Sequence, residues 1–117
     1  ITMYPYRRKN KYGAKKTTID GITFDSKWEA QRWGELKAME RGGYVKDLER
    51  QVKYEIIVND QKICWYVADF RYKKVDDDGT EEAVVEDAKG FETPDFKLKK
   101  KLMKAVHGIE LFLSRKS

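Results

Sequence analysis

An aspartate and a lysine two residues apart are the residues of this chain best suited to chemistry on a phosphate group. Asp87 and Lys89 flank Ala88 and follow the apolar pair that starts at Val84. Residues two apart in a strand share one face, so the carboxylate and the ammonium would stand side by side at the end of a buried strand. Such triplets also arise by chance, and a surface ion pair is the structural alternative.

Asp69 supplies a second carboxylate from an earlier strand pattern. It alternates with Trp65 and Val67 in an apolar stretch, where an unpaired charge is costly. Two aspartates on neighbouring strands repel each other unless a divalent cation lies between them. Carboxylate oxygens suit hard cations, so we predict Mg²⁺ or Mn²⁺ as cofactor. Glu86 is the fallback ligand, because one β-bulge would exchange its direction with that of Asp87.

Glu29 is the third candidate carboxylate. The segment from Ser26 to Glu29 fits a capping box, in which the glutamate has a purely structural reason to be present. Glu29 also falls on the same helical stripe as Trp33 and Leu36, which should pack on the core. We therefore include Glu29 in the candidate site.

The elements that must position these residues follow from local signals. A helix is predicted from the cap at Ser26 to about Arg41, where Gly42-Gly43 stops it. Thr93-Pro94 starts a second helix, which Gly108 ends. Alternation and short apolar runs predict strands over 52–58, 63–75, 83–89 and 109–113. This order predicts an α/β fold with an αβββαβ core, in which a small mixed sheet is flanked by helices.

Positive charge lies at both ends of the 117-residue chain, a length that suits one domain. We expect a basic arm over 1–16 and a single domain over 17–117. The ends flank an acidic centre, which suits a grip on DNA around a metal site, although basic ends also serve solubility. The predicted DNA contacts are Arg7, Arg8, Lys9, Lys11, Lys15, Lys16, Gln51, Lys53, Lys97, Lys100 and Lys101.

Several classes of site are excluded or disfavoured. Cys64 is the only cysteine, so neither an intrachain disulfide nor a cysteine-based zinc site can form, and a reducing cytoplasm is the natural setting. No stretch approaches the ~20 apolar residues of a membrane span, so we expect no membrane partner. His107, the only histidine, precedes Gly108 and is expected near a helix C-terminus rather than as a catalytic base.

The order of the candidate residues resembles the PD-(D/E)xK nuclease superfamily. A glutamate on the first helix is followed by an aspartate on the second strand and by D-x-K on the third. The stretches that carry the resemblance are FDSKWEA at 24–30, YVADF at 66–70 and VVEDAKG at 84–90. Ala68 stands where the superfamily has proline before the aspartate, which lowers the specificity of the motif but leaves the ligand in place.

More narrowly, the chain is similar to a family of small phage-encoded proteins described as endonucleases. The similarity covers nearly all of residues 10–113, including NKY at 10–12, DGITFDS at 20–26 and LERQ at 48–51. The phage endonucleases that resolve Holliday junctions share the order of Glu, Asp and D/E-x-K. The resemblance implies a Mg²⁺-dependent endodeoxyribonuclease that acts in the host cytoplasm on branched, recombination or replication DNA.

Under this resemblance Asp69 and Asp87 would hold the metal ion, and Glu29 would assist directly or through water. Lys89 would orient the attacking water, and Gln51 with Lys53 would contact phosphate. A non-catalytic nucleic-acid-binding accessory protein is the main alternative, and a phage structural or assembly protein is a third. The DNA structure that is cut stays open. So does a homodimer, since symmetrical junction cleavage would need two active sites.

Overall fold

The protein is described by a computed structural model that covers residues 16–19 and 21–116. The elements of this part, in chain order, are β1 (Thr17–Ile19), β2 (Ile22–Phe24), α1 (Lys27–Arg41), β3 (Val45–Val58), β4 (Gln61–Val75), β5 (Glu81–Ala88), α2 (Pro94–His107) and β6 (Phe112–Ser114). The predicted α/β class and the αβββαβ order from α1 to β6 are confirmed. No helix in the described ranges is long and apolar enough to cross a membrane.

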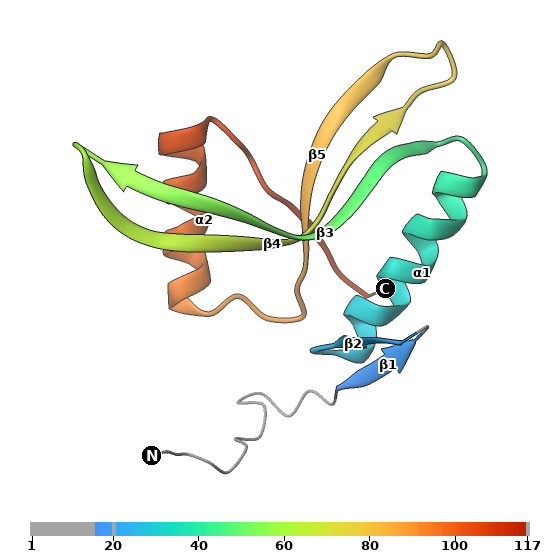
Figure 1. The fold of residues 1–117 in the computed structure, drawn as a ribbon, viewed down its shortest axis with the longest axis horizontal. Coiled ribbons are helices and arrows are strands. Elements are labelled where there is room, and N and C mark those ends of the chain that lie inside the picture. Colours follow the sequence, from blue (N-terminus) through green and yellow to red (C-terminus); the bar gives the residue numbers. More distant parts are fainter. Residues whose placement is uncertain (1–15, 20, 117) are drawn as a thin grey trace.

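One mixed sheet and one small hairpin make up the strands of the described residues. The sheet has the order β3-β4-β5-β6, with β3, β4 and β5 antiparallel and β6 parallel to β5. The strands β1 and β2 pair antiparallel beside the start of α1. Figure 1 shows α1 and α2 on opposite sides of the sheet, with the turn end of β3 and β4 extending over α2. The layers are therefore helix, sheet and helix.

Local capping chemistry sets the helix ends, as predicted. The Ser26 hydroxyl accepts a hydrogen bond from the Glu29 amide at 3.0 Å, and Gly42 caps the other end of α1. At α2, the Thr93 hydroxyl accepts from the Phe96 amide at 3.1 Å. Gly108 ends α2 in the left-handed conformation, with φ of 69°, which a residue without a Cβ adopts at no steric cost.

The hydrophobic core has two parts, one under each helix. On the α1 side, Leu36 packs with residues of β3 and β4, including Val45 and Phe70. On the α2 side, Met103 packs with residues of β3, β4 and β5, including Tyr66. Each helix therefore covers a different part of one twisted sheet.

Several features differ from the predicted elements, among them β5, which spans 81–88 rather than 83–89 and so ends just before Lys89. The strand predicted from Val52 begins seven residues earlier, at Val45, because Val45 is buried against Leu36 although charged residues follow it. The last strand spans 112–114 rather than 109–113. The stretch Ile22–Phe24, which is not among the predicted strands, pairs with Thr17–Ile19 as a hairpin. Residues 1–15 of the predicted basic arm lie outside the described residues.

Glu86, the fallback metal ligand, is engaged elsewhere. Its side chain is fully buried, and its Oε2 accepts a hydrogen bond from Arg32 Nε at 2.6 Å. Its Oε1 accepts from Arg32 Nη2 at 3.2 Å and from the Tyr72 hydroxyl at 2.6 Å. Both oxygens therefore have partners. Asp87, and not Glu86, is the carboxylate of β5 that is available to a metal ion.

The Glu86 arrangement predicts a stability effect. Replacing Arg32 with Met keeps an apolar stem but leaves the buried Glu86 carboxylate without its cation. Breaking a buried ion pair in this way costs about 3–5 kcal/mol. Urea unfolding should show a loss of this size for Arg32→Met and little change for Glu82→Gln, an exposed glutamate on the same strand. Equal stability of the two variants would contradict this account of Glu86.

Candidate functional site

The strands β4 and β5 separate where Asp69 and Asp87 lie. Their paired register ends with Phe70 opposite Glu86. Beyond this pair, the Ala88 amide donates a hydrogen bond to Asp69 Oδ2 at 2.9 Å. The aspartate side chain thus takes over from the strand backbone as the acceptor. The structure brings the two predicted aspartates together at this point.

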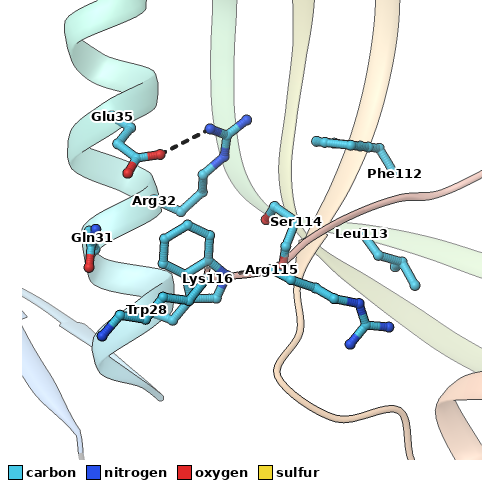
Figure 2. Close-up of a pocket in the computed structure, with 9 residues that line it drawn as sticks. All are labelled: Trp28, Gln31, Arg32, Glu35, Phe112, Leu113, Ser114, Arg115 and Lys116. Atoms are coloured by element: carbon cyan, nitrogen blue, oxygen red, sulfur yellow. Dashed lines mark hydrogen bonds and ion pairs between the residues drawn. The ribbon is translucent and has the colours of Figure 1, made fainter.

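The last strand and the first helix hold the D-x-K segment from the other side. The Ser114 carbonyl accepts hydrogen bonds from the Lys89 amide and from Trp28 Nε1, both at 3.0 Å. The Ser114 hydroxyl also donates to the Asp87 carbonyl at 3.4 Å. Figure 2 shows Trp28 and Ser114 facing each other across the junction of α1 and β6. One carbonyl therefore links α1, β5 and β6 beside the candidate residues.

Glu29 lies in the first turn of α1 and is only 4% exposed. Burial, followed by the charges of Asp69 and Asp25, raises its pKa from 4.5 to about 7. Its Oε2 accepts a hydrogen bond from Gln51 Nε2 at 3.4 Å and lies 3.9 Å from Arg50 Nη2. The Glu29 carboxyl group therefore points into the site, as the place of Glu29 on the core-facing stripe of α1 predicted.

Asp87 is the most isolated acid of the site. It is 1% exposed, and burial raises its pKa from 3.8 to about 7 although Lys89 and the backbone of Asp69 act to lower it. Its Oδ2 has no hydrogen-bond partner among the described residues. Burial also raises the pKa of Asp69, against the opposing effects of the Ala88 amide and Lys89. A buried carboxylate oxygen without a donor is what a metal ligand requires.

Lys89 stands beside both aspartates. Its positive charge acts to lower the pKa of Asp69 and of Asp87, which places the ammonium near both carboxyl groups. Its Nζ lies 4.6 Å from the centre of the Phe96 ring at the start of α2. The aromatic face therefore holds the ammonium in place without neutralising it. All four predicted residues, Glu29, Asp69, Asp87 and Lys89, meet in one region.

Two further residues of the site did not come out of the sequence analysis. The Arg50 guanidinium lies 4.8 Å from the centre of the Phe24 ring, next to the Glu29 carboxyl group. Asp25 raises the pKa of both Glu29 and Asp69. Arg50 belongs to the LERQ stretch of the resemblance, which was the one available signal. Asp25 directly precedes the helix cap, and nothing in its spacing marks it.

The charges around the site favour a cation. Four acids (Asp25, Glu29, Asp69 and Asp87) face three cations (Arg50, Lys89 and Lys16, which pairs with Asp25), which gives a formal charge of −1 when all are ionised. Within the part of the chain that the structure describes, however, no three acidic, histidine or cysteine side chains stand ready as ligands of one ion. Mutual repulsion separates acidic side chains when no cation lies between them. The donor types fit Mg²⁺ or Mn²⁺.

Two pockets flank α1 at this end. The first has a volume of about 270 Å³ and is lined by Thr23, Asp25, Glu29, Arg50 and Gln51, so it borders the candidate site at Glu29. The second, drawn in Figure 2, has a volume of about 330 Å³ and lies between α1 and β6. Its Arg32 and Arg115 are paired with acids, Arg115 with Glu92 at 2.7 Å. The first pocket is the one of the two that a predicted site residue, Glu29, lines.

The predicted DNA contacts are spread over the surface. Gln51 contacts Glu29, whereas Lys53 is exposed on β3 and Lys97 and Lys101 are exposed on α2. Two of the predicted lysines are in ion pairs, Lys16 with Asp25 at 3.4 Å and Lys100 with Glu92 at 3.1 Å. The other five lie outside the described residues: Arg7, Arg8, Lys9, Lys11 and Lys15. These contacts stay predictions.

His107 lies in the last turn of α2, as expected. Its Nε2 is 2.9 Å from the Glu55 carbonyl, and its ring packs beside Tyr54. It thus bonds to β3 at the far end of α2 from Phe96, which faces Lys89. The interpretation of His107 as a helix-end residue holds.

The raised pKa values predict how stability depends on pH without metal. The neutral form of Asp87 is favoured in the fold, so its contribution is complete below the unfolded pKa of 3.8 and is lost as pH rises through about 7. Asp87→Asn keeps a neutral side chain at every pH. In chelator, its stability should rise relative to the wild type between about pH 4 and about pH 8, by up to about 4 kcal/mol.

Urea unfolding of both proteins at the two pH values measures this difference. Asp77→Asn, which changes an exposed aspartate in the turn between β4 and β5, is the matched control and should show no such trend. A stability difference for Asp87→Asn that does not change with pH would contradict the raised pKa of Asp87.

Comparisons with known proteins give one match. Neither the search of curated proteins nor the search of solved structures returns a match. Residues 9–114 match the family described as "Protein of unknown function (DUF1064)". This range includes the four predicted site residues and all six strands and both helices of the described structure. The chain therefore belongs to the protein family of unknown function DUF1064.

Proposed function

We propose that this protein is a metal-dependent endodeoxyribonuclease, which hydrolyses phosphodiester bonds of DNA and is related to the PD-(D/E)xK nucleases. The observation that carries the proposal is Asp87. Its carboxylate is buried, its Oδ2 has no hydrogen-bond donor among the described residues, and it lies next to Asp69 and Lys89. A buried carboxylate oxygen without a donor destabilises a fold, so a bound cation is the simplest reason for its presence.

Each residue of the site has a definable part. The oxygens of Asp69 and Asp87 would hold the divalent cation, with Glu29 reaching it directly or through a water molecule. When bound, such an ion lowers the pKa of a water and polarises the scissile phosphate. Lys89, whose ammonium is fixed against Phe96, would orient the attacking water and offset negative charge on the phosphate.

The basic and amide side chains of β3 complete the arrangement. Arg50 Nη2 and Gln51 Nε2 both lie close to Glu29, and both residues line the same pocket as Glu29. A guanidinium forms paired hydrogen bonds to a phosphate, so Arg50 is the better candidate of the two for holding the DNA backbone. The substrate proposed is branched, recombination or replication DNA of a phage in its host's cytoplasm.

A non-catalytic nucleic-acid-binding accessory protein is the second candidate. It is favoured by the lack, among the described residues, of three acidic side chains already in place around one ion. The two functions differ in one respect. An accessory protein would bind DNA without cutting it, whereas a nuclease would nick plasmid DNA in Mg²⁺ or Mn²⁺ and stop in chelator.

Carboxylate substitutions should separate binding from cleavage. Asp69→Asn and Asp87→Asn each remove a negative ligand from the cation, so we expect cleavage to be lost while folding and DNA binding persist. Plasmid nicking, with circular dichroism and a DNA-binding assay beside it, measures all three. Asp77→Asn is the control and should cut normally. Nicking at the wild-type rate by either site variant would show that its aspartate is not a ligand.

Lys89 tests the catalytic proposal in a different way. Lys89→Met keeps the stem and removes the charge. We expect cleavage to slow by ~10²–10³, as when a positioned charge-stabilising group is removed, with metal and DNA binding nearly unchanged. Lys74→Met, at an exposed lysine near the end of β4, is the control. If saturating Mg²⁺ restores full cleavage by Lys89→Met, the lysine is only a counter-ion to the aspartates.

A further inference from the structure

One face of the β3–β4 hairpin is uncovered in the part of the chain that the structure describes. Residues on the opposite face, such as Tyr66, pack against α2. On the uncovered face, Lys53 pairs with Val67 and Glu55 pairs with Trp65 across the two strands. Trp65 is 48% exposed and Val67 is 39% exposed. An exposed apolar patch of this kind on an open sheet face is typical of a binding surface.

The strand that carries this face leads to the candidate site. The register of β3 and β4 runs without a shift from Arg50 opposite Phe70 to Ile56 opposite Cys64. Trp65 and Val67 lie on β4, the strand that also carries Asp69. Asp69 follows Trp65 by four positions, a distance of about 13 Å along the strand. A DNA strand stacked at ~3.4 Å per nucleotide covers it in about four nucleotides.

We infer that this hairpin face binds unpaired nucleotides next to the cleavage site, with Trp65 as the stacking platform for a base. The inference rests on the proposed nuclease function and gives it a substrate class. That class is DNA with an unpaired or single-stranded segment beside the scissile phosphate. A base inside an intact duplex is already stacked on both sides and gains nothing from Trp65.

The side chains around Trp65 suit such a contact. Lys62 Nζ lies 5.2 Å from the centre of the indole ring and pairs with Glu55 at 2.8 Å. This ion pair leaves the tip of the hairpin close to neutral, with the exposed Lys53 nearer to the site. Stacking, rather than charge, is therefore the main source of affinity here, because bases stack on aromatic rings with little dependence on sequence.

The size of the face argues against a second copy of the chain as its partner. Two strands about 4.8 Å apart and about seven residues long present roughly 230 Å². A stable protein–protein interface buries about 800 Å² on each partner. A few stacked nucleotides, in contrast, fit a surface of this width and length.

Three variants test the inference by fluorescence anisotropy with labelled DNA. The two DNAs are a blunt duplex and the same duplex with a single-stranded arm, in Ca²⁺ so that binding is measured without Mg²⁺-supported cleavage. We expect Trp65→Ala to bind the armed DNA about tenfold more weakly and the blunt duplex within about twofold of wild type. Trp65→Phe keeps an aromatic ring and should restore most of the affinity. Tyr44→Ala, at an exposed aromatic residue before β3, is the control.

A second readout is intrinsic tryptophan fluorescence. The armed DNA should quench it in the wild type and quench it less in Trp65→Ala. Equal loss of affinity for both DNAs, or no loss, would overturn the inference. So would a wild-type dimer that Trp65→Ala makes monomeric with unchanged DNA binding, since that assigns the face to a second copy.

Plasmid nicking in Mg²⁺ by the same proteins separates the two proposals. If the wild type nicks DNA and Trp65→Ala binds the armed DNA normally, the inference about the hairpin fails and the nuclease proposal stands. If the wild type neither binds nor cuts DNA, both fail.

Discussion

The geometry of the candidate site depends on the hydrogen bond from the Ala88 amide to the Asp69 carboxylate, at 2.9 Å. Because the β4–β5 pairing ends at Phe70 opposite Glu86, the Asp69 side chain and the hydrogen bond of the Asp69 backbone to Asp87 continue the connection between the two strands at that point. The bond fixes one oxygen of Asp69 and the backbone beside Asp87. The strands can then separate without leaving the Ala88 amide unpaired, a loss that would cost about 1–3 kcal/mol in a buried position.

The adjacent acids Glu86 and Asp87 of β5 differ in their hydrogen-bond partners, and this difference distinguishes a structural role from a chemical one. Glu86 is fully buried, but Arg32 and Tyr72 satisfy both of its oxygens, so it behaves as a structural ion pair. Asp87 faces the other way and is as deeply buried, yet one of its oxygens has no donor among the described residues. From the sequence alone, a single β-bulge could exchange the directions of these two side chains. The regular β5–β6 register, which pairs Asp87 with Leu113, removes that ambiguity.

The parts of the fold that sequence reasoning predicted are those that local chemistry determines. Helix ends at Ser26 and Gly108 follow from side-chain caps and from left-handed glycine, which a short window reveals. The early start of β3 at Val45 and the position of Arg50 could not be predicted, because both depend on packing against α1 and β2. The resemblance predicted that the candidate acids lie close together. The effect of Asp25 on the pKa values of Glu29 and Asp69 depends on the tertiary structure, which no local sequence signal reveals.

The central claim is that Glu29, Asp69 and Asp87 form one divalent-cation site. Calorimetric titration of Mn²⁺ into the wild-type protein, in buffers of different ionisation enthalpy, tests it most directly. Since Glu29 and Asp87 have pKa values of about 7, binding should release protons at about pH 6 and almost none at about pH 8. Asp87→Asn should weaken the binding and release fewer protons. Absence of saturable Mn²⁺ binding at about pH 8, or binding that Asp87→Asn leaves unchanged, would contradict the account.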